Sequence, residues 1–285
     1  MIRRPTYGKL GHVWQGFDTI AGLKRINYGY GGALFRVRRG SDNAEKDFFS
    51  TEAVAAWVGA GNDGFVTKLY DQGGKGNDWT NDTTAEQPKL VNNGALITLQ
   101  SKPMMDFSGG QVLKANRLIY NNDKLYCSAV CGAKQTNQTQ DILSHWNTSN
   151  NRAGWILRFG NNGRQFVAFS NNGSSVSSFA YQTYTSNTVH IVEGLFSINE
   201  EGFSNQAQAH TDNFSEYITV AASGGDGASI NSPDIPLGLG ARFNGDDLNN
   251  ALTGYIGEVM IKIDDNKAGK RAAIFNDINK RWGIV

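Results

Sequence analysis

One glycine-rich loop gathers the oxygen-bearing side chains whose spacing could bind a ligand. It runs from 71 to 78 and carries Asp71, Asn77 and Asp78 around three glycines. Such oxygens suit Ca²⁺, but these residues also turn the backbone through their own side chains. The loop lacks the ordered spacing of an EF-hand and the Lys-Ser/Thr ending of a phosphate loop. We therefore expect a hydrogen-bonded turn, with no metal and no cofactor, and calcium stays an open alternative.

Two tryptophans lie next to polar residues. Trp79 follows the loop directly, and Trp146 lies in an Asn-rich stretch. Sugar sites stack an aromatic ring on the sugar and surround it with polar groups. The predicted ligand-binding residues, for a glycan, are Trp79, Trp146, Asp71, Asn77 and Asp78. For Trp79, the alternative is a packed anchor of the loop.

Other catalytic patterns are weak. The four histidines are scattered, and neither a His-x-x-x-His pair nor a Gly-x-Ser-x-Gly elbow occurs. We interpret His190 as a packed histidine on a strand face. Cys127 and Cys131 share a strand face at a spacing too wide for easy bridging, and they are interpreted as buried thiols.

The elements that must position these residues are mostly strands. The chain of 285 residues has 34 glycines, and this turn-rich composition favours many short strands in an all-β sandwich. We expect an arm at 1–12 and a single domain at 13–285. Strands are predicted at 33–39, 65–70, 155–159, 166–169, 190–198 and 255–263. Short helices are predicted at 14–23, at 50–59 with Ser50 as the cap, and at 269–281 before Gly283.

The late strand at 255–263 has a specific predicted orientation. Alternation places Glu258 and Lys262 on one face. The opposite face would carry Tyr255, Gly257, Val259, Ile261 and Ile263.

Charge and hydropathy argue against several partners. Lys plus Arg is 27 and Asp plus Glu is 26, for a net charge of +1, which gives no reason to expect nucleic acid. The run Arg36–Arg39 alternates with apolar residues and is interpreted as a solvated strand face. No apolar run is long enough to span a membrane, and no signal-peptide core follows Met1. We expect neither membrane insertion nor export.

Several stretches together resemble a known family. They are 34–47, 64–78, 87–91, 105–109 and the ending 254–259 with 282–284. In this order they resemble LamG-like domains of bacteriophage structural proteins, of tail or decoration type. The same pattern opens the catalytic domain of α-L-arabinofuranosidase B. The resemblance implies a concanavalin A-like jelly-roll sandwich with a few short helices, including a C-terminal one.

The resemblance to the arabinofuranosidase leaves the catalytic pair incomplete. It implies an acid/base aspartate where this chain has Arg242, with Asp246 and Asp247 displaced, and Glu193 is the nearest match to the nucleophile. A retaining glycosidase needs two carboxyl groups about 5–5.5 Å apart. With a cation in one of the two positions, we expect no catalytic residues and no enzyme.

The resemblance therefore predicts a phage virion surface protein, of tail, baseplate or capsid-decoration type. It would be a non-catalytic adhesion module that binds host-surface glycans, located on the virion and assembled in the host cytoplasm. Its partners would be other virion proteins, and homo-oligomers stay open. Two alternatives remain: a glycoside hydrolase of arabinofuranosidase type, and a purely structural virion protein without glycan binding.

Overall fold

The computed structural model describes most of the chain. The described residues are 14–118, 121–122, 124–146, 152–173, 178–197, 206–212, 219–220, 230–231, 233–244, 247–263 and 270–285. The predicted arm at 1–12 lies outside them, as does Asp246.

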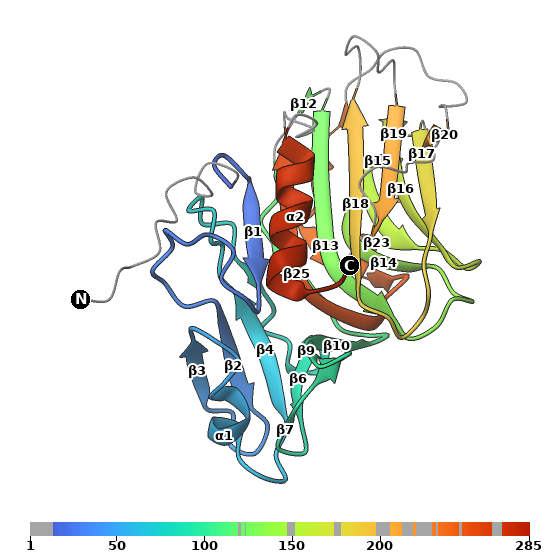
Figure 1. Cartoon of the computed structure of the whole chain (residues 1–285). Coiled ribbons are helices and arrows are strands. Elements are labelled where there is room, and N and C mark those ends of the chain that lie inside the picture. Colours follow the sequence, from blue (N-terminus) through green and yellow to red (C-terminus); the bar gives the residue numbers. More distant parts are fainter. Residues whose placement is uncertain are drawn as a thin grey trace.

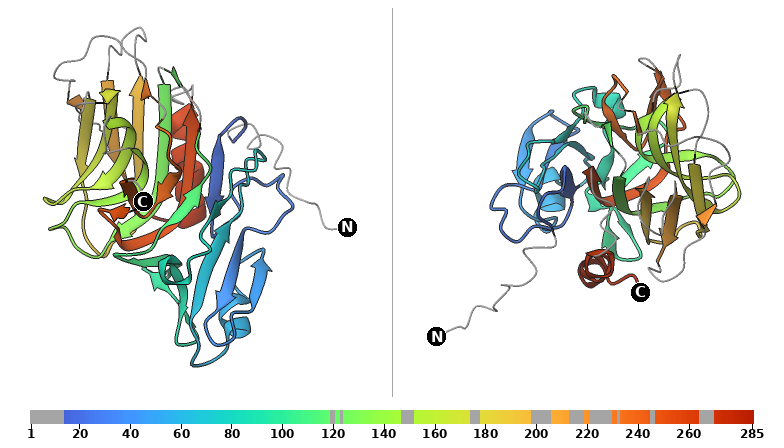
Figure 2. Two further views of the ribbon diagram at one scale, coloured as in Figure 1. Left: turned by 180° about the vertical axis from the view of Figure 1, so that it is seen from behind. Right: turned by 90° about the horizontal axis from the view of Figure 1, so that it is seen from above.

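Two curved antiparallel layers make the body of the molecule (Figures 1 and 2). In one layer the central strand is β13 (Lys124–Ala133), which pairs with β25 (Thr253–Ile263) on one side and β18 (His190–Ser197) on the other. β19 (Gln206–Thr211) pairs with β18 and extends this layer. In the other layer four strands pair in chain order, β14 (Gln140–Trp146), β15 (Arg152–Phe159), β16 (Arg164–Gly173) and β17 (Ser178–Thr183). β22 (Leu237–Leu239) pairs with the free side of β14. This is the all-β sandwich predicted from the composition.

Residues 14–108 build a lobe beside this body (Figure 1). Both of its connecting strands, β1 and β10, pair with β25, and the pairing continues from β10 through β6 to β4 and β2. The lobe contains β1 (Thr19–Gly22), β2 (Phe35–Arg39), β3 (Glu45–Phe48), α1 (Val54–Val58), β4 (Gly64–Leu69), β6 (Lys89–Asn92) and β10 (Met105–Ser108). The shorter elements are β5 (Trp79–Thr80), η1 (Thr84–Glu86), β7 (Ala95–Leu96), β8 (Thr98–Leu99), β9 (Lys102–Pro103), β11 (Leu113–Ala115), β12 (Asn121–Asn122), β20 (Thr219–Val220), β21 (Ile230–Asn231), β23 (Arg242–Asn244) and β24 (Asp247–Asn249).

The core lies between the two layers because inward side chains alternate along every strand. Cys127 and Ala129 of β13 belong to the same buried cluster as Trp155 and Leu157 of the facing layer. Both cysteines are buried free thiols, as predicted. Each fully buried large apolar side chain contributes roughly 1.5–3 kcal/mol, so this interior holds the layers together.

The C-terminal helix α2 (Arg271–Trp282) covers the outer face of β13, β18 and β25 (Figures 1 and 2). Its apolar stripe, including Ile274, Ile278 and Trp282, joins a second buried cluster with outward residues of those strands. The helix ends at Gly283, whose φ of 59° is the left-handed conformation of a C-terminal cap. The approach is close at Gly257, where a Cβ atom would lie 2.3 Å from the Trp282 ring.

Two local predictions were wrong. The segment 14–23 is not helical, because Thr19–Gly22 is extended and pairs with the 258–261 segment of β25. Its apolar spacing serves packing against the second buried cluster instead. The predicted helix near 50–59 forms as α1, but its first cap residue is Ala53 and no side chain caps it, so Ser50 does not have the predicted role.

The predicted alternation of β25 holds for only part of its length. Val259 and Ile261 face the inner core as predicted. A β-bulge opposite Val130 and Cys131 then shifts the register, so that Ile256 faces the inner core and Tyr255 packs on the outer side. A bulge adds an unpaired residue to one strand, and the alternation pattern in the sequence does not reveal it.

Candidate functional site

The glycine-rich loop is closed around the carboxylate of Asp71. Its Oδ1 accepts hydrogen bonds from the backbone N–H groups of Ile20 (3.0 Å) and Gly73 (2.8 Å). Its Oδ2 accepts from the N–H groups of Lys75 (2.9 Å) and Asn77 (3.3 Å). The side chain is buried, so Asp71 organises the loop and ties it to β1.

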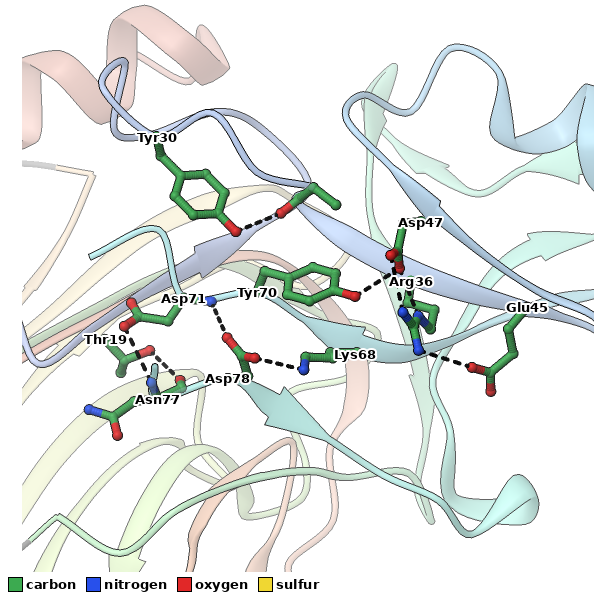
Figure 3. Close-up of polar contacts among 11 residues, drawn as sticks. Thr19, Tyr30, Arg36, Glu45, Asp47, Lys68, Tyr70, Asp71, Asn77 and Asp78 are labelled. Carbon is green, nitrogen blue, oxygen red and sulfur yellow. Dashed lines mark hydrogen bonds and ion pairs between the residues drawn. The ribbon is translucent and has the colours of Figure 1, made fainter. Parts of the chain in front are cut away.

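The other predicted ligand-binding residues of the loop continue this network (Figure 3). The Asn77 amide donates to the carbonyl oxygen of Asp18 (2.6 Å). Asp78 accepts from the Asp71 N–H group (2.7 Å) and forms an ion pair with Lys68 (2.7 Å). The loop is therefore a clasp, defined as residues 71–79, that joins β4 to β1.

Trp79 completes the clasp from inside the core. Its side chain has 0% exposure, and its indole N–H donates to the hydroxyl of Thr19 (3.1 Å). Trp146, in β14, is also buried at 3%. A ring that stacks on a sugar needs an open face, and neither ring has one here. For Trp79 this geometry matches the packed anchor considered as the alternative.

The clasp does not fit a calcium ion in this conformation. Ca²⁺ takes six to eight oxygen ligands, whereas the Asp71 oxygens already accept four N–H donors. Among the described residues there is no group of three or more His, Cys, Asp or Glu side chains that could hold a metal. A bound cation would first have to break the hydrogen bonds that shape the loop.

The outer face of β2, β3 and β4 carries a row of paired charges next to the clasp (Figure 3). Asp47 accepts from the Arg36 Nε (2.7 Å) and the Tyr70 hydroxyl (2.8 Å). The Arg36 guanidinium lowers the pKa of Asp47, while burial and Asp47 raise the pKa of Tyr70 to about 12. Arg36 fits the predicted solvated strand face, but Arg38 is buried and donates to Gln87 (2.8 Å).

Glu193, the nearest sequence match to a catalytic glutamate, is enclosed beneath α2. It has 0% exposure, and its carboxylate accepts from the Tyr126 hydroxyl (2.6 Å) and from Arg271 Nε (3.0 Å). Burial raises the pKa values of both Glu193 and Tyr126. A second buried carboxylate, Glu258, accepts from the Trp282 indole N–H (2.7 Å). These groups fasten α2 to the sheet and bury the Glu193 carboxylate between them.

Arg242 belongs to a second buried charge cluster that sequence reasoning missed. The carboxylate of Asp141, with 0% exposure, pairs with Arg158 (2.7 Å) and Arg242 (3.5 Å). With the Asn250 amide oriented to match its neighbours, its oxygen accepts from Arg158 Nη2 (3.2 Å) and Arg242 Nη2 (3.0 Å). Burial raises the pKa of Asp141, although both guanidiniums oppose the rise. A carboxyl group from β14 thus lies beside the arginine that replaces the expected aspartate.

His190 and His145 are structural in their contacts. His190 has both ring nitrogens engaged, by Asp212 and by the Thr185 carbonyl oxygen (2.8 Å). His145 is buried, and its Nε2 hydrogen-bonds the Ile235 carbonyl oxygen (3.1 Å). Burial lowers the pKa of His145 to about 4.

Comparison with known proteins identifies solved structures that share this fold. No family model and no curated protein sequence matches the chain. Solved structures do match. A GH54 a-l-arabinofuranosidase soaked with a cyclic sulfate inhibitor is 13% identical, with a TM-score of 0.70, over 94% of this chain and 64% of that chain. An arabinofuranosidase complexed with arabinofuranosyl-alpha-1,2-xylobiose is 14% identical, with a TM-score of 0.68 over the same shares.

These comparisons confirm the predicted β-sandwich of jelly-roll type and correct the predicted function. Three solved structures that share the fold over 94% of the chain are arabinofuranosidases, and these matches do not support a phage virion protein or a LamG assignment. The prediction of a non-catalytic virion module is therefore overturned. It gave the arginine at position 242 more weight than the fold; in the structure, Arg242 pairs with the buried carboxylate of Asp141.

In the part of the chain that the structure describes, no helix is long and apolar enough to cross a membrane.

Proposed function

We propose that this chain is a carbohydrate-active protein that hydrolyses a glycosidic bond, of the arabinofuranosidase type. The observation that carries the proposal is the extent of the shared fold, 94% of the chain at a TM-score of 0.70. The chain spans 64% of the length of those longer proteins. The comparison shows a shared fold; hydrolysis of a glycosidic bond by this chain is what we propose.

Hydrolysis of a glycoside needs two carboxyl groups, one of them able to donate a proton. Glu193 is fully buried beneath α2 and pairs with Arg271. Asp141 is equally buried, and burial raises its pKa as it does for Glu193. We choose Asp141 as the proton donor to test because it pairs with Arg242, the position where the resemblance implies the acid/base aspartate. Asp106 of β10, which pairs with Lys134 and is partly exposed, is the second carboxylate to test.

The test is release of 4-nitrophenol from 4-nitrophenyl α-L-arabinofuranoside, the compound soaked into a mutant GH54 a-l-arabinofuranosidase. We expect release in proportion to protein concentration. Replacing a general acid or base typically lowers kcat by about 10²–10⁴-fold, so Asp141→Asn or Asp106→Asn should lose activity while a melting curve shows a folded protein.

Glu193→Gln is the matched control, because it also replaces a buried carboxyl group with an amide, but at the site beneath α2. We expect its kcat to stay near that of the unmodified chain. Selective loss of kcat in this variant, with an unchanged melting curve, would contradict the assignment. Absence of release from both furanoside and pyranoside substrates would contradict hydrolysis itself.

A further inference from the structure

A polar hollow opens where three connections of the sandwich meet. They are the β13–β14 connection, the β15–β16 turn and the segment between β24 and β25. The hollow has a volume of about 600 Å³. Its lining includes four side-chain amides and two hydroxyls, those of Asn137, Gln138, Asn161, Asn250, Thr139 and Thr253.

The lining of the hollow is uncharged, and its side chains can both donate and accept hydrogen bonds. None of the residues that line the hollow is charged. A side-chain amide offers two N–H donors and a carbonyl acceptor, and a hydroxyl offers both roles. A sugar presents the same mixture, since each of its hydroxyl groups donates and accepts. An ionic ligand would find no countercharge here.

A second hollow, of about 330 Å³, provides the contrast. It lies between β5, β11 and β22 and is lined by Lys114, Arg117 and Asp234 together with Asn116. Arg117 and Asp234 pair with each other at 2.6 Å. A neutral ligand gains less there, because charged groups keep their water and their partners.

The rim of the polar hollow is fixed by the protein itself. The Gln135 amide donates to Gln138 Oε1 (2.7 Å), and the Thr253 N–H group donates to Gln140 Oε1 (2.7 Å). The Lys134 N–H group donates to the Thr253 carbonyl oxygen (3.0 Å). A rim that is ordered before binding loses less conformational entropy when a ligand arrives.

The buried charge cluster explains how the inner wall is held. The Asp141 N–H group donates to the Asn250 carbonyl oxygen (2.7 Å). In the amide orientation that matches its neighbours, Asn250 accepts from Arg158 and Arg242, and Asp141 balances their charge. Asn250 therefore presents its amide in one orientation, with Arg158 and Arg242 as positioning residues.

We infer that this hollow binds one unit of a neutral sugar through the amides and hydroxyls of its rim. The inference rests on the proposed function, because the sugar would be part of the glycan that the chain acts on. Asn137 and Asn161, at the exposed outer rim, make direct hydrogen bonds to the sugar.

The experiment titrates L-arabinose, a neutral sugar that the proposed hydrolysis does not consume, into the unmodified chain and into Asn137→Ala, Asn161→Ala and Asn116→Ala by isothermal titration calorimetry. Loss of one neutral hydrogen bond weakens affinity by about fivefold, so each of the first two variants should bind about fivefold more weakly. Asn116→Ala, a matched exposed amide in the charged hollow, should bind as the unmodified chain does. Trigalacturonic acid, which is anionic, should not compete.

A measurement without any substitution keeps the test independent of variant folding. In a ¹⁵N-labelled chain, the side-chain amide signals of Asn137, Gln138 and Asn161 should shift on addition of the neutral sugar. Binding that leaves these signals unmoved, binding unaffected in both rim variants, or no binding of the neutral sugar would each overturn the inference.

The outcomes separate the inference from the proposed function. Hydrolysis of the furanoside without rim-dependent binding would overturn the hollow and leave the hydrolase proposal standing. Rim-dependent binding without hydrolysis would support the hollow and contradict the hydrolase proposal.

Discussion

The clasp and the polar hollow carry similar polar side chains, but those of the clasp are buried or half-buried and hydrogen-bonded, whereas those at the outer rim of the hollow are exposed. In the clasp, Asp71 accepts four backbone N–H groups and Trp79 has no exposed surface. In the hollow, Asn137 and Asn161 project from turns and are exposed. A polar side chain whose hydrogen bonds are all satisfied internally stabilises the fold, whereas one left at a concave surface is available to a ligand.

The charge clusters extend the comparison. Glu193 beneath α2 and Asp141 behind Asn250 are both fully buried and paired with arginines. Helix α2 covers the Glu193 pair. The Asp141 cluster instead contacts the side-chain amide of Asn250, which lines the hollow. Residue type alone does not distinguish an ion pair that holds a helix from one that supports a ligand-binding surface. The distinction depends on whether a helix or an open hollow lies next to the pair.

The largest expected effect is the removal of the clasp's anchor. Trp79→Ala should lower the free energy of unfolding by about 4 kcal/mol, since large-to-small changes of a buried aromatic cost about 3–5 kcal/mol. Urea unfolding followed by circular dichroism measures this. If the variant kept its stability and lost only sugar binding, Trp79 would be part of a site and the contrast with the hollow would fail.

Breaking the cluster beneath α2 should have a somewhat smaller effect. Arg271→Met leaves Glu193 buried without its cation, and such a change costs about 3 kcal/mol because the charge is no longer compensated. The double variant Glu193→Gln/Arg271→Met should recover most of that loss. A double variant as unstable as the single one would show that the ion pair is not what holds the helix.

Acidification should destabilise the fold through His145. Its pKa is lowered to about 4 in the folded chain, from 6.5. Folding therefore favours the neutral form of His145. The stability that this form contributes is fully present above pH 6.5 and is lost as the pH falls toward 4. By pH 4 the loss should reach about 2–3 kcal/mol.

Urea midpoints between pH 7 and pH 4 measure this loss, with His145→Gln as the comparison. The variant should show a shallower dependence on pH over this window. Equal slopes in the two proteins would assign the acid sensitivity to other groups.

The smallest expected change in stability belongs to the hollow. Asn161→Ala removes an exposed turn side chain, and surface substitutions of this kind usually stay within about 0.5 kcal/mol. Its melting temperature should therefore match that of the unmodified chain while its affinity for the neutral sugar falls. A large loss of stability would show that Asn161, like Asp71, serves the fold.

The sequence by itself determined the local elements that obey a single period. Alternation placed the strands of the 155–169 hairpin, β18 and most of β25, and the i, i+3, i+7 spacing with Gly283 placed α2. These elements could be predicted because neighbours along the chain set the pattern. The same reasoning missed the bulge in β25 and gave a helix at 14–23, since both depend on pairing with distant strands.

Only the tertiary structure decided which polar residues are open and which are closed. The clasp closes because Asp71 meets the N–H group of Ile20 from a strand far away in sequence. The hollow opens because three connections, from positions near 137, 161 and 250, converge to line it. The Asn-rich turns were visible in the sequence as turn formers, but their shared lining was not. Burial and hydrogen-bond satisfaction depend on contacts between distant parts of the chain.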